Sequence, residues 1–164
     1  MRTYILAVVV ACGVTACSRG PRTEPLAVFP VDSRVLRGNE SGLRDPMERV
    51  ITTAQELSPI WQQAVSTQRT PPPEPQVDFT RSMLLVVAAG RMFDEDAVRV
   101  DSVVEREVAG PSRTQRVLHV HYTLAAGCRR ADSQSAYPVE IVQVRRYTGD
   151  VRFVPQRVSA ANCR

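Results

Sequence analysis

The sequence has no lysine, since all 21 of its basic residues are arginine. Without a lysine amine the chain cannot form a Schiff base, a Ser–Lys dyad or the phosphate-binding lysine of a P-loop. The arginines lie among acidic residues rather than in one stripe, and the formal net charge is only +4. That distribution, together with the export signal described next, argues against nucleic-acid binding.

The sequence also lacks an apolar run long enough to cross a bilayer, which takes about 20 residues. Its longest such run stands at the N-terminus, where Arg2 precedes roughly a dozen apolar or small residues that end at Thr15. This arrangement is typical of a secretory signal peptide. A buried N-terminal strand is the alternative interpretation.

The end of this run, Val14-Thr15-Ala16-Cys17, resembles the lipobox of bacterial lipoproteins. The resemblance implies a lipoprotein signal peptide over residues 1–16 and acyl chains, such as palmitate, on Cys17. Cys12 ends a second matching sequence, but cleavage there would leave too short an apolar core. Two or three acyl chains hold a protein stably on a membrane. We therefore expect a lipid-anchored envelope protein, which faces the periplasm from the outer membrane if the cell has one.

Two cysteines, Cys128 and Cys163, remain after Cys12 is removed and Cys17 is lipidated. An exported protein lies in a compartment where thiols oxidise, so the sequence predicts a structural disulfide between them. Two unpaired thiols are the alternative. A redox-active pair is disfavoured because such pairs usually stand as C-x-x-C.

The length and composition of the mature chain indicate one domain on a flexible leash. Residues 17–33 are expected to form the tether, since residues 18–25 are rich in Ser, Gly, Pro and charge. Residues 34–164 then form the domain. Inside it, the proline-rich residues 69–75 are expected to be a stiff connector rather than a docking motif.

Alternating apolar and polar residues predict strands over most of the domain. Residues 97–108 and 116–124 both alternate, and turn-forming residues between them predict a hairpin. The uniformly apolar residues 83–89 are expected at the centre of a sheet, and residues 137–144 and 151–154 are expected to add further strands. In the first hairpin strand, the side predicted to face the core carries Val98, Val100, Val104 and Val108.

One helix is predicted from Thr53, which stands three residues before Glu56 at the spacing of a capping box. Pro59 is expected to kink this helix or to restart it at Ser58. Trp61 is expected to pack the helix against the sheet. The predicted apolar face carries Leu57, Ile60, Trp61, Ala64 and Val65. The fold class is therefore α+β, a mostly antiparallel sheet of sandwich or barrel-like form with one packed helix.

The order of these elements resembles the C-terminal domain of the protease complex subunit PrcB family. The resemblance runs over residues ~35–154, and its best motifs are Val77-Asp78-Phe79 and Tyr137-Pro138. It implies a non-catalytic subunit that associates with an exported protease. This chain lacks the family's Gly-Gly-Tyr-like turn after Gly90, so a partner that reads this turn would differ.

The two histidines are the strongest metal candidates. His119 and His121 occupy alternate positions of a predicted strand, so both imidazoles project from one face. Zinc needs a third protein ligand, which would have to be an acid on the paired strand, namely Asp101, Glu105 or Glu107. An ordinary polar outer face is the interpretation that the sequence favours.

Other candidate sites are weaker still. The acidic residues Asp94 to Asp96 lack the glycine and glutamate of a calcium loop, so a solvated turn is expected. No G-x-S-x-G is present to support a serine nucleophile. The sequence thus predicts no catalytic residue, no cofactor and no enzyme.

The leading hypothesis for function is a membrane-anchored, non-catalytic module that binds an envelope protein, such as an exported protease. One rival is a metal-dependent enzyme built on His119 and His121. Another rival is a purely structural envelope lipoprotein.

Overall fold

The computed structural model describes residues 25–109 and 114–160. The predicted signal peptide over residues 1–16, the predicted lipidation site Cys17 and the predicted disulfide partner Cys163 lie outside the described residues. Within the two described ranges, no helix combines the length and the hydropathy needed to cross a membrane.

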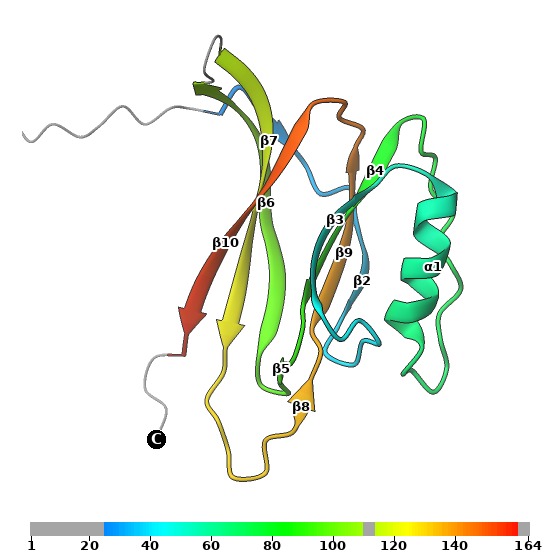
Figure 1. The fold of residues 1–164 in the computed structure, drawn as a ribbon, viewed down its shortest axis with the longest axis vertical. Helices are drawn as coiled ribbons and strands as arrows, with labels where there is room; N and C mark the ends of the chain where they lie inside the picture. Colours follow the sequence, from blue (N-terminus) through cyan, green and yellow to red (C-terminus); the bar gives the residue numbers. More distant parts are fainter. Residues whose placement is uncertain (1–24, 110–113, 161–164) are drawn as a thin grey trace, which may run out of the picture.

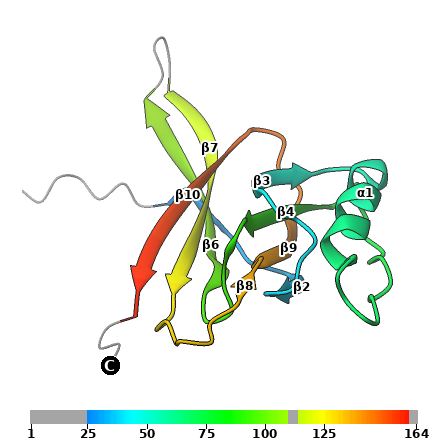
Figure 2. The same ribbon diagram turned by 60° about the horizontal axis from the view of Figure 1, so that its bottom comes forward.

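The domain has three layers, which are one helix and two four-stranded sheets (Figure 1). The middle layer, here the inner sheet, has the strand order β2-β9-β4-β3, and the outer sheet has the order β1-β6-β7-β10. Figure 2 shows α1 on the side of the inner sheet that faces away from the outer sheet. The bounds are β1 Ala27–Phe29, β2 Ser33–Gly38, β3 Pro46–Ile51, α1 Ala54–Val65, β4 Ser82–Ala89, β5 Met92–Phe93, β6 Ala97–Ala109, β7 Thr114–Ala126, β8 Ser135–Ala136, β9 Val139–Arg145 and β10 Asp150–Ser159.

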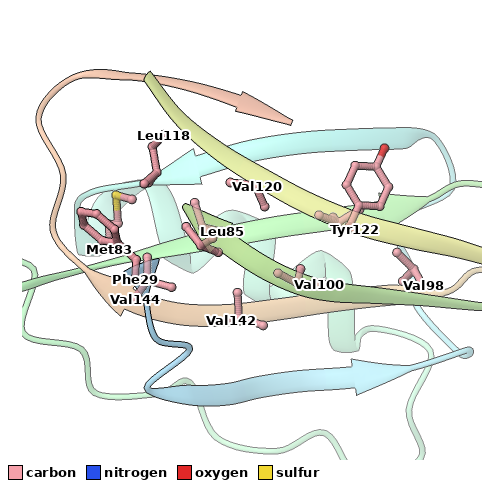
Figure 3. Packing of buried hydrophobic residues seen from close by; sticks show 12 residues of the cluster. Phe29, Met83, Leu85, Val98, Val100, Leu118, Val120, Tyr122, Val142 and Val144 are labelled. Carbon is pink, nitrogen blue, oxygen red and sulfur yellow. The ribbon is translucent and has the colours of Figure 1, made fainter. Parts of the chain in front are cut away.

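The main core lies between the two sheets, where branched and aromatic side chains interdigitate (Figure 3). Strand β4 contributes to this core and, through alternate residues, to a second core beneath α1. All residues of β4 except the last are buried. The prediction that residues 83–89 lie at the centre of a sheet, covered on both faces, is confirmed.

The helix begins as predicted, with the Thr53 hydroxyl accepting a hydrogen bond from the backbone N–H of Glu56 at 3.2 Å. It runs through Pro59 as one helix, so the expected restart at Ser58 is wrong, and the expected kink at Pro59 stays a prediction. Trp61 is buried in the second core, and its indole N–H donates to the carbonyl of Pro72 at 3.3 Å. The proline-rich connector therefore lies against α1. The predicted apolar face is confirmed, because Leu57, Ile60, Trp61, Ala64 and Val65 are all buried.

The predicted hairpin is confirmed, since β6 and β7 pair antiparallel along almost their whole length. The side-chain directions are correct only up to Val100, because the register shifts between Val100 and Ser102. This bulge adds one residue and inverts the alternation beyond it. Val103 consequently faces the core, whereas Val104, predicted to do so, lies on the opposite face beside His119.

Two features at the ends of the outer sheet differ from simple expectation. Strand β1 falls inside the range 17–33 expected to be tether, and it pairs with β6. Strand β10 pairs parallel with β7 over ten residues. The other strand pairs are antiparallel and both sheets are open, so the predicted α+β class is confirmed in its sandwich form rather than as a barrel.

Candidate functional site

A polar hollow of about 560 Å³ lies at one end of the sandwich, next to the short strand pair β5 and β8 (bottom of Figure 1). Segments that are far apart in the sequence meet there: the chain after β2, the chain after α1, and the chain around β5 and β8. Its lining residues are Asn39, Glu40, Ser41, Arg44, Thr67, Asp94, Gln134, Ser135, Ala136 and Tyr137.

Hydrogen bonds hold these segments together. The side-chain amide of Asn39 donates to the carbonyl oxygens of Asp94 and Asp96, at 2.9 and 3.0 Å. The backbone N–H of Tyr137 donates to the carbonyl of Asn39 at 2.7 Å, and the hydroxyl of Thr67 donates to the carbonyl of Glu40 at 2.8 Å. The hollow is thus built on fixed backbone.

Arg44 and Tyr137 form the most distinctive pair in the hollow. The guanidinium carbon of exposed Arg44 stands 4.0 Å from the centre of the half-buried Tyr137 ring. A stacked arginine and tyrosine offer a flat apolar surface and several N–H donors in one place. Both residue types are enriched at the energetic centres of protein interfaces.

The chain after Gly90 borders the same hollow. Gly90 ends β4 with φ of 71°, and a Cβ there would stand 2.7 Å from the Cδ of Pro46, so both backbone and space require glycine. Arg91 next donates to the hydroxyl of Ser135 at 3.1 Å. The chain after Gly90 and the Tyr137-Pro138 motif, two of the three sequence features considered for the PrcB resemblance, therefore lie side by side.

The predicted turn is present at Asp94 and Glu95, and Asp94 is exposed, but the prediction of a solvated position is wrong for Asp96. Its carboxylate is buried and accepts from the backbone N–H groups of Phe93 at 3.0 Å and Gly127 at 2.9 Å. Arg129 lies 3.6 Å away. Asp96 thus ties the chain after β7 to the chain between β5 and β6.

His119 and His121 project together from the outer face of the outer sheet, as predicted, with ring centres 6.0 Å apart. The Nε2 atom of each ring is shielded from solvent and has no hydrogen-bond partner. Burial lowers the pKa of His119 below its usual value, and the nearby charges of His121, Arg152 and Arg106 lower it further. Both imidazoles therefore lie in a cationic environment.

The acids proposed as further metal ligands do not join the histidines. Glu105 pairs with Leu118 and accepts from the Tyr147 hydroxyl at 3.2 Å, which places it on the core side of the sheet. Glu107 has the same phase, because the bulge shifts both positions. Asp101 is engaged by Arg99 at 2.8 Å and by the Thr123 hydroxyl. In the described part of the chain, no three His, Cys, Asp or Glu side chains form a group that could hold a metal ion.

Cys128 stands after β7, and its sulfur is disulfide-bonded. The backbone N–H of Ala160 donates to the carbonyl of Ala126 at 2.8 Å. The chain just before Cys128 and the chain shortly before Cys163 are therefore neighbours. The pairing of Cys128 with Cys163 stays a prediction, since Cys163 lies outside the described residues.

Sequence reasoning missed the hollow and one buried charge. Glu140 lies between the sheets and accepts hydrogen bonds from the Arg34 guanidinium and the Val100 backbone N–H. Its sequence signal is an acid in phase with Val142 and Val144, which face the core. The hollow has no comparable local signal, because its residues come from separate segments.

Comparisons with known proteins leave the chain without a matched relative. No family model, curated protein or solved structure matches it.

Proposed function

We propose that this protein is a lipid-anchored, non-catalytic module of the cell envelope that binds another envelope protein, as an accessory subunit of an exported protease would. The anchor is the acylated Cys17, and residues 17–24 connect it to the sandwich. The polar hollow next to Tyr137 is the docking surface for the partner.

The observation that carries this proposal is the convergence at the hollow. Arg44 stacks on Tyr137, and the chain after Gly90 lies against the segment that leads to Tyr137. Polar residues from several segments, among them Glu40, Asp94 and Gln134, line the rest of the surface. A partner segment that enters the hollow would find both an aromatic contact and directional hydrogen bonds, which together give specificity.

The test is recovery of the native partner. The full-length protein, purified in mild detergent from its own envelope, is expected to carry one protein at constant stoichiometry. Arg44→Ala and Tyr137→Ala are each expected to weaken that complex at least tenfold, whereas Arg49→Ala, which truncates an exposed arginine on β3, leaves it intact. Mass spectrometry of the co-purified material identifies the partner.

Two results would reject the proposal. One is recovery of the protein alone in repeated preparations at native expression. The other is an intact mass that still includes residues 1–16 with an unmodified Cys17, because the protein would then have no anchor.

A further inference from the structure

We propose that the outer face of the outer sheet lies against the membrane surface and contacts anionic phospholipid headgroups. The outer face is defined as the side of β1, β6, β7 and β10 that points away from the inner sheet. This inference rests on the lipid anchor of the proposed function and adds an orientation and a second ligand class to it.

Exposed apolar side chains gather on the outer sheet. Three large hydrophobic residues in the described chain are strongly exposed, namely Leu26 at 47 %, Val28 at 65 % and Val158 at 43 %. Residues that pair across neighbouring strands point to the same face of a sheet. Val28 pairs with Val104, and Val104 pairs with His119. On β10, Arg152 pairs with His119, and Val158 follows Arg152 by an even number of residues, so its side chain points the same way. Val28 and Val158 therefore lie on one face, at its two edges, and Leu26 stands at a bend directly before β1.

Basic side chains lie at the centre of that face. Arg152 is exposed and stands opposite His119 on the neighbouring strand. Arg106 and His121 are close enough to act on His119 electrostatically. The Nε2 atoms of His119 and His121 have no partner. In this cluster the exposed guanidinium of Arg152 offers N–H donors and positive charge, the chemistry that binds a phosphate group, while the lowered pKa of His119 favours its neutral form.

The acids on the same face do not cancel this cluster. Asp101 lies beyond His121 and is engaged by Arg99 and the Thr123 hydroxyl. Asp150, opposite Val117, precedes Arg152 by two residues on the same face, but no ion pair joins the two within the described residues. Val28 lies on the β1 flank of this cluster. Basic and apolar side chains on one surface are typical of proteins that lie on anionic bilayers.

The outer sheet begins a short distance along the chain from the proposed anchor at Cys17. Leu26 follows Cys17 by nine residues. A fully extended chain covers at most ~3.5 Å per residue, so Leu26 stays within ~30 Å of the lipidated sulfur. Leu26 leads into β1, an edge strand of the outer sheet. A domain tethered at this edge brings the outer face to the bilayer more readily than the helix on its opposite side.

This orientation leaves the hollow accessible. Figure 1 places the outer sheet on the left of the molecule, with β5 and β8 at its lower end. The hollow is lined by β8 and by loops of the inner sheet, and no residue of the cationic cluster lines it. The membrane and the protein partner would therefore occupy different surfaces.

The test uses the mature chain from residue 17 with Cys17→Ser, so that no acyl chain contributes to binding. Co-sedimentation is measured with vesicles of phosphatidylcholine alone and with vesicles of phosphatidylcholine and phosphatidylglycerol in equal parts. Partitioning onto the mixed vesicles is expected to be at least tenfold stronger. Arg152→Gln and Val28→Ser are each expected to reduce it several-fold, and both positions are exposed, so folding should be retained. Arg49→Gln, on the inner sheet, is the matched control.

Three outcomes overturn the inference. Equal partitioning onto both vesicle types removes the headgroup contact. If calorimetry shows that the protein binds inorganic phosphate, that Arg152→Gln abolishes this binding, and that the protein does not bind vesicles, the face is a small-anion site instead. Stoichiometric zinc that His119→Ala removes assigns a metal site. None of these results changes the lipid mass on Cys17 or the complex formed through Tyr137, so they are distinguishable from failure of the proposed function.

Discussion

Glu140 is a buried carboxylate that joins the two sheets through side-chain contacts. Its carboxylate accepts from the Val100 N–H, while Arg34 donates both to Glu140 and, at 3.3 Å, to the Val100 carbonyl. Strand β1 pairs with Val103, Val104 and Glu105 of β6, so this pairing does not reach Val100. The edge of β6 at Val100 is therefore satisfied by side chains rather than by a strand, which avoids unpaired buried backbone groups.

Removal of this carboxylate should be costly. Glu140→Ala is expected to lower the free energy of unfolding by about 3 kcal/mol, because the partly exposed Arg34 guanidinium and the buried Val100 N–H lose their acceptor together. Urea denaturation with an unchanged m-value measures the loss. Asp132→Ala, which breaks an exposed pair with Arg130 (3.6 Å), is the control and should cost less than about 0.5 kcal/mol. Equal effects of the two substitutions would contradict the role given to Glu140.

His119 should make stability depend on pH. Its pKa is lowered in the folded state by burial and by His121, Arg152 and Arg106, so the unfolded chain takes up the proton more readily. Above the ordinary histidine pKa of about 6.5 both states are neutral and the effect is absent. As the pH falls through that value toward the folded pKa, the free energy of unfolding should decrease. Urea midpoints from pH 8 to pH 5 measure this loss, and His119→Gln should reduce the slope; an unchanged slope would exclude His119 as its source.

At the scale of elements, the features that depend on a short stretch of sequence were predicted correctly. The helix start, the β6–β7 hairpin and the central position of β4 follow from capping, alternation and apolar runs within short windows. The bulge at Asp101 was not predicted: Ser102 and Val103 break the alternation, but the residues on both sides of the break fit one uninterrupted strand. Its position is favoured by long-range contacts, since the Val100 backbone is bound by Arg34 and Glu140 from other strands.

Strand β10 is a long edge strand, and Pro155 lies at its middle. The N–H of Ala160 bonds to β7, and the register from Asp150 to Ser159 is continuous, so even-numbered residues bond to β7 and odd-numbered ones face the free edge. Pro155 therefore removes a donor from the exposed edge at a point where the ladder loses nothing. Proline and charge at such edges oppose pairing with other chains.

Restoring that donor should promote self-association. Pro155→Val is expected to produce dimers or larger species at concentrations where the parent protein is monomeric, because the edge then offers an unbroken row of N–H groups. Sedimentation velocity measures the change. Gln156→Val adds the same side chain without an edge donor, since residue 156 bonds to β7, and should stay monomeric. Association of both variants alike would point to added hydrophobicity rather than to edge pairing.

At the scale of the whole molecule, the candidate surfaces depend on pairings that no sequence window contains. The hollow needs β5 to meet β8 and the chain after β2 to meet Tyr137. The outer face needs β1 and β10 on opposite edges of one sheet, although they lie at opposite ends of the described chain. The sequence predicted His119 and His121 on one face correctly, because both lie within one strand. It misplaced their acidic neighbours, because the bulge changes which residues of β6 stand beside them.

The C-terminal end of the domain also depends on a contact between segments far apart in the sequence. Residues 155–159 of β10 are exposed, and within residues 25–109 and 114–160 their backbone pairs with β7 alone. A disulfide between Cys128 and Cys163 would hold this edge, since the Ala160–Ala126 hydrogen bond already brings the two segments together. Closing a loop of this length should stabilise the fold by about 3–4 kcal/mol, chiefly by restricting the unfolded chain.

Two measurements test this link. The native, lipidated protein should show no reactive thiol in denaturant, because Cys17 is a thioether and the other two cysteines are paired. The double variant Cys128→Ser, Cys163→Ser should unfold at lower urea concentration, and hydrogen exchange should accelerate first in β10, whose outer edge has no neighbouring strand in the described ranges. Two reactive thiols in native material, or an unchanged urea midpoint in the double variant, would show that the contacts of β10 with β7 alone hold the edge.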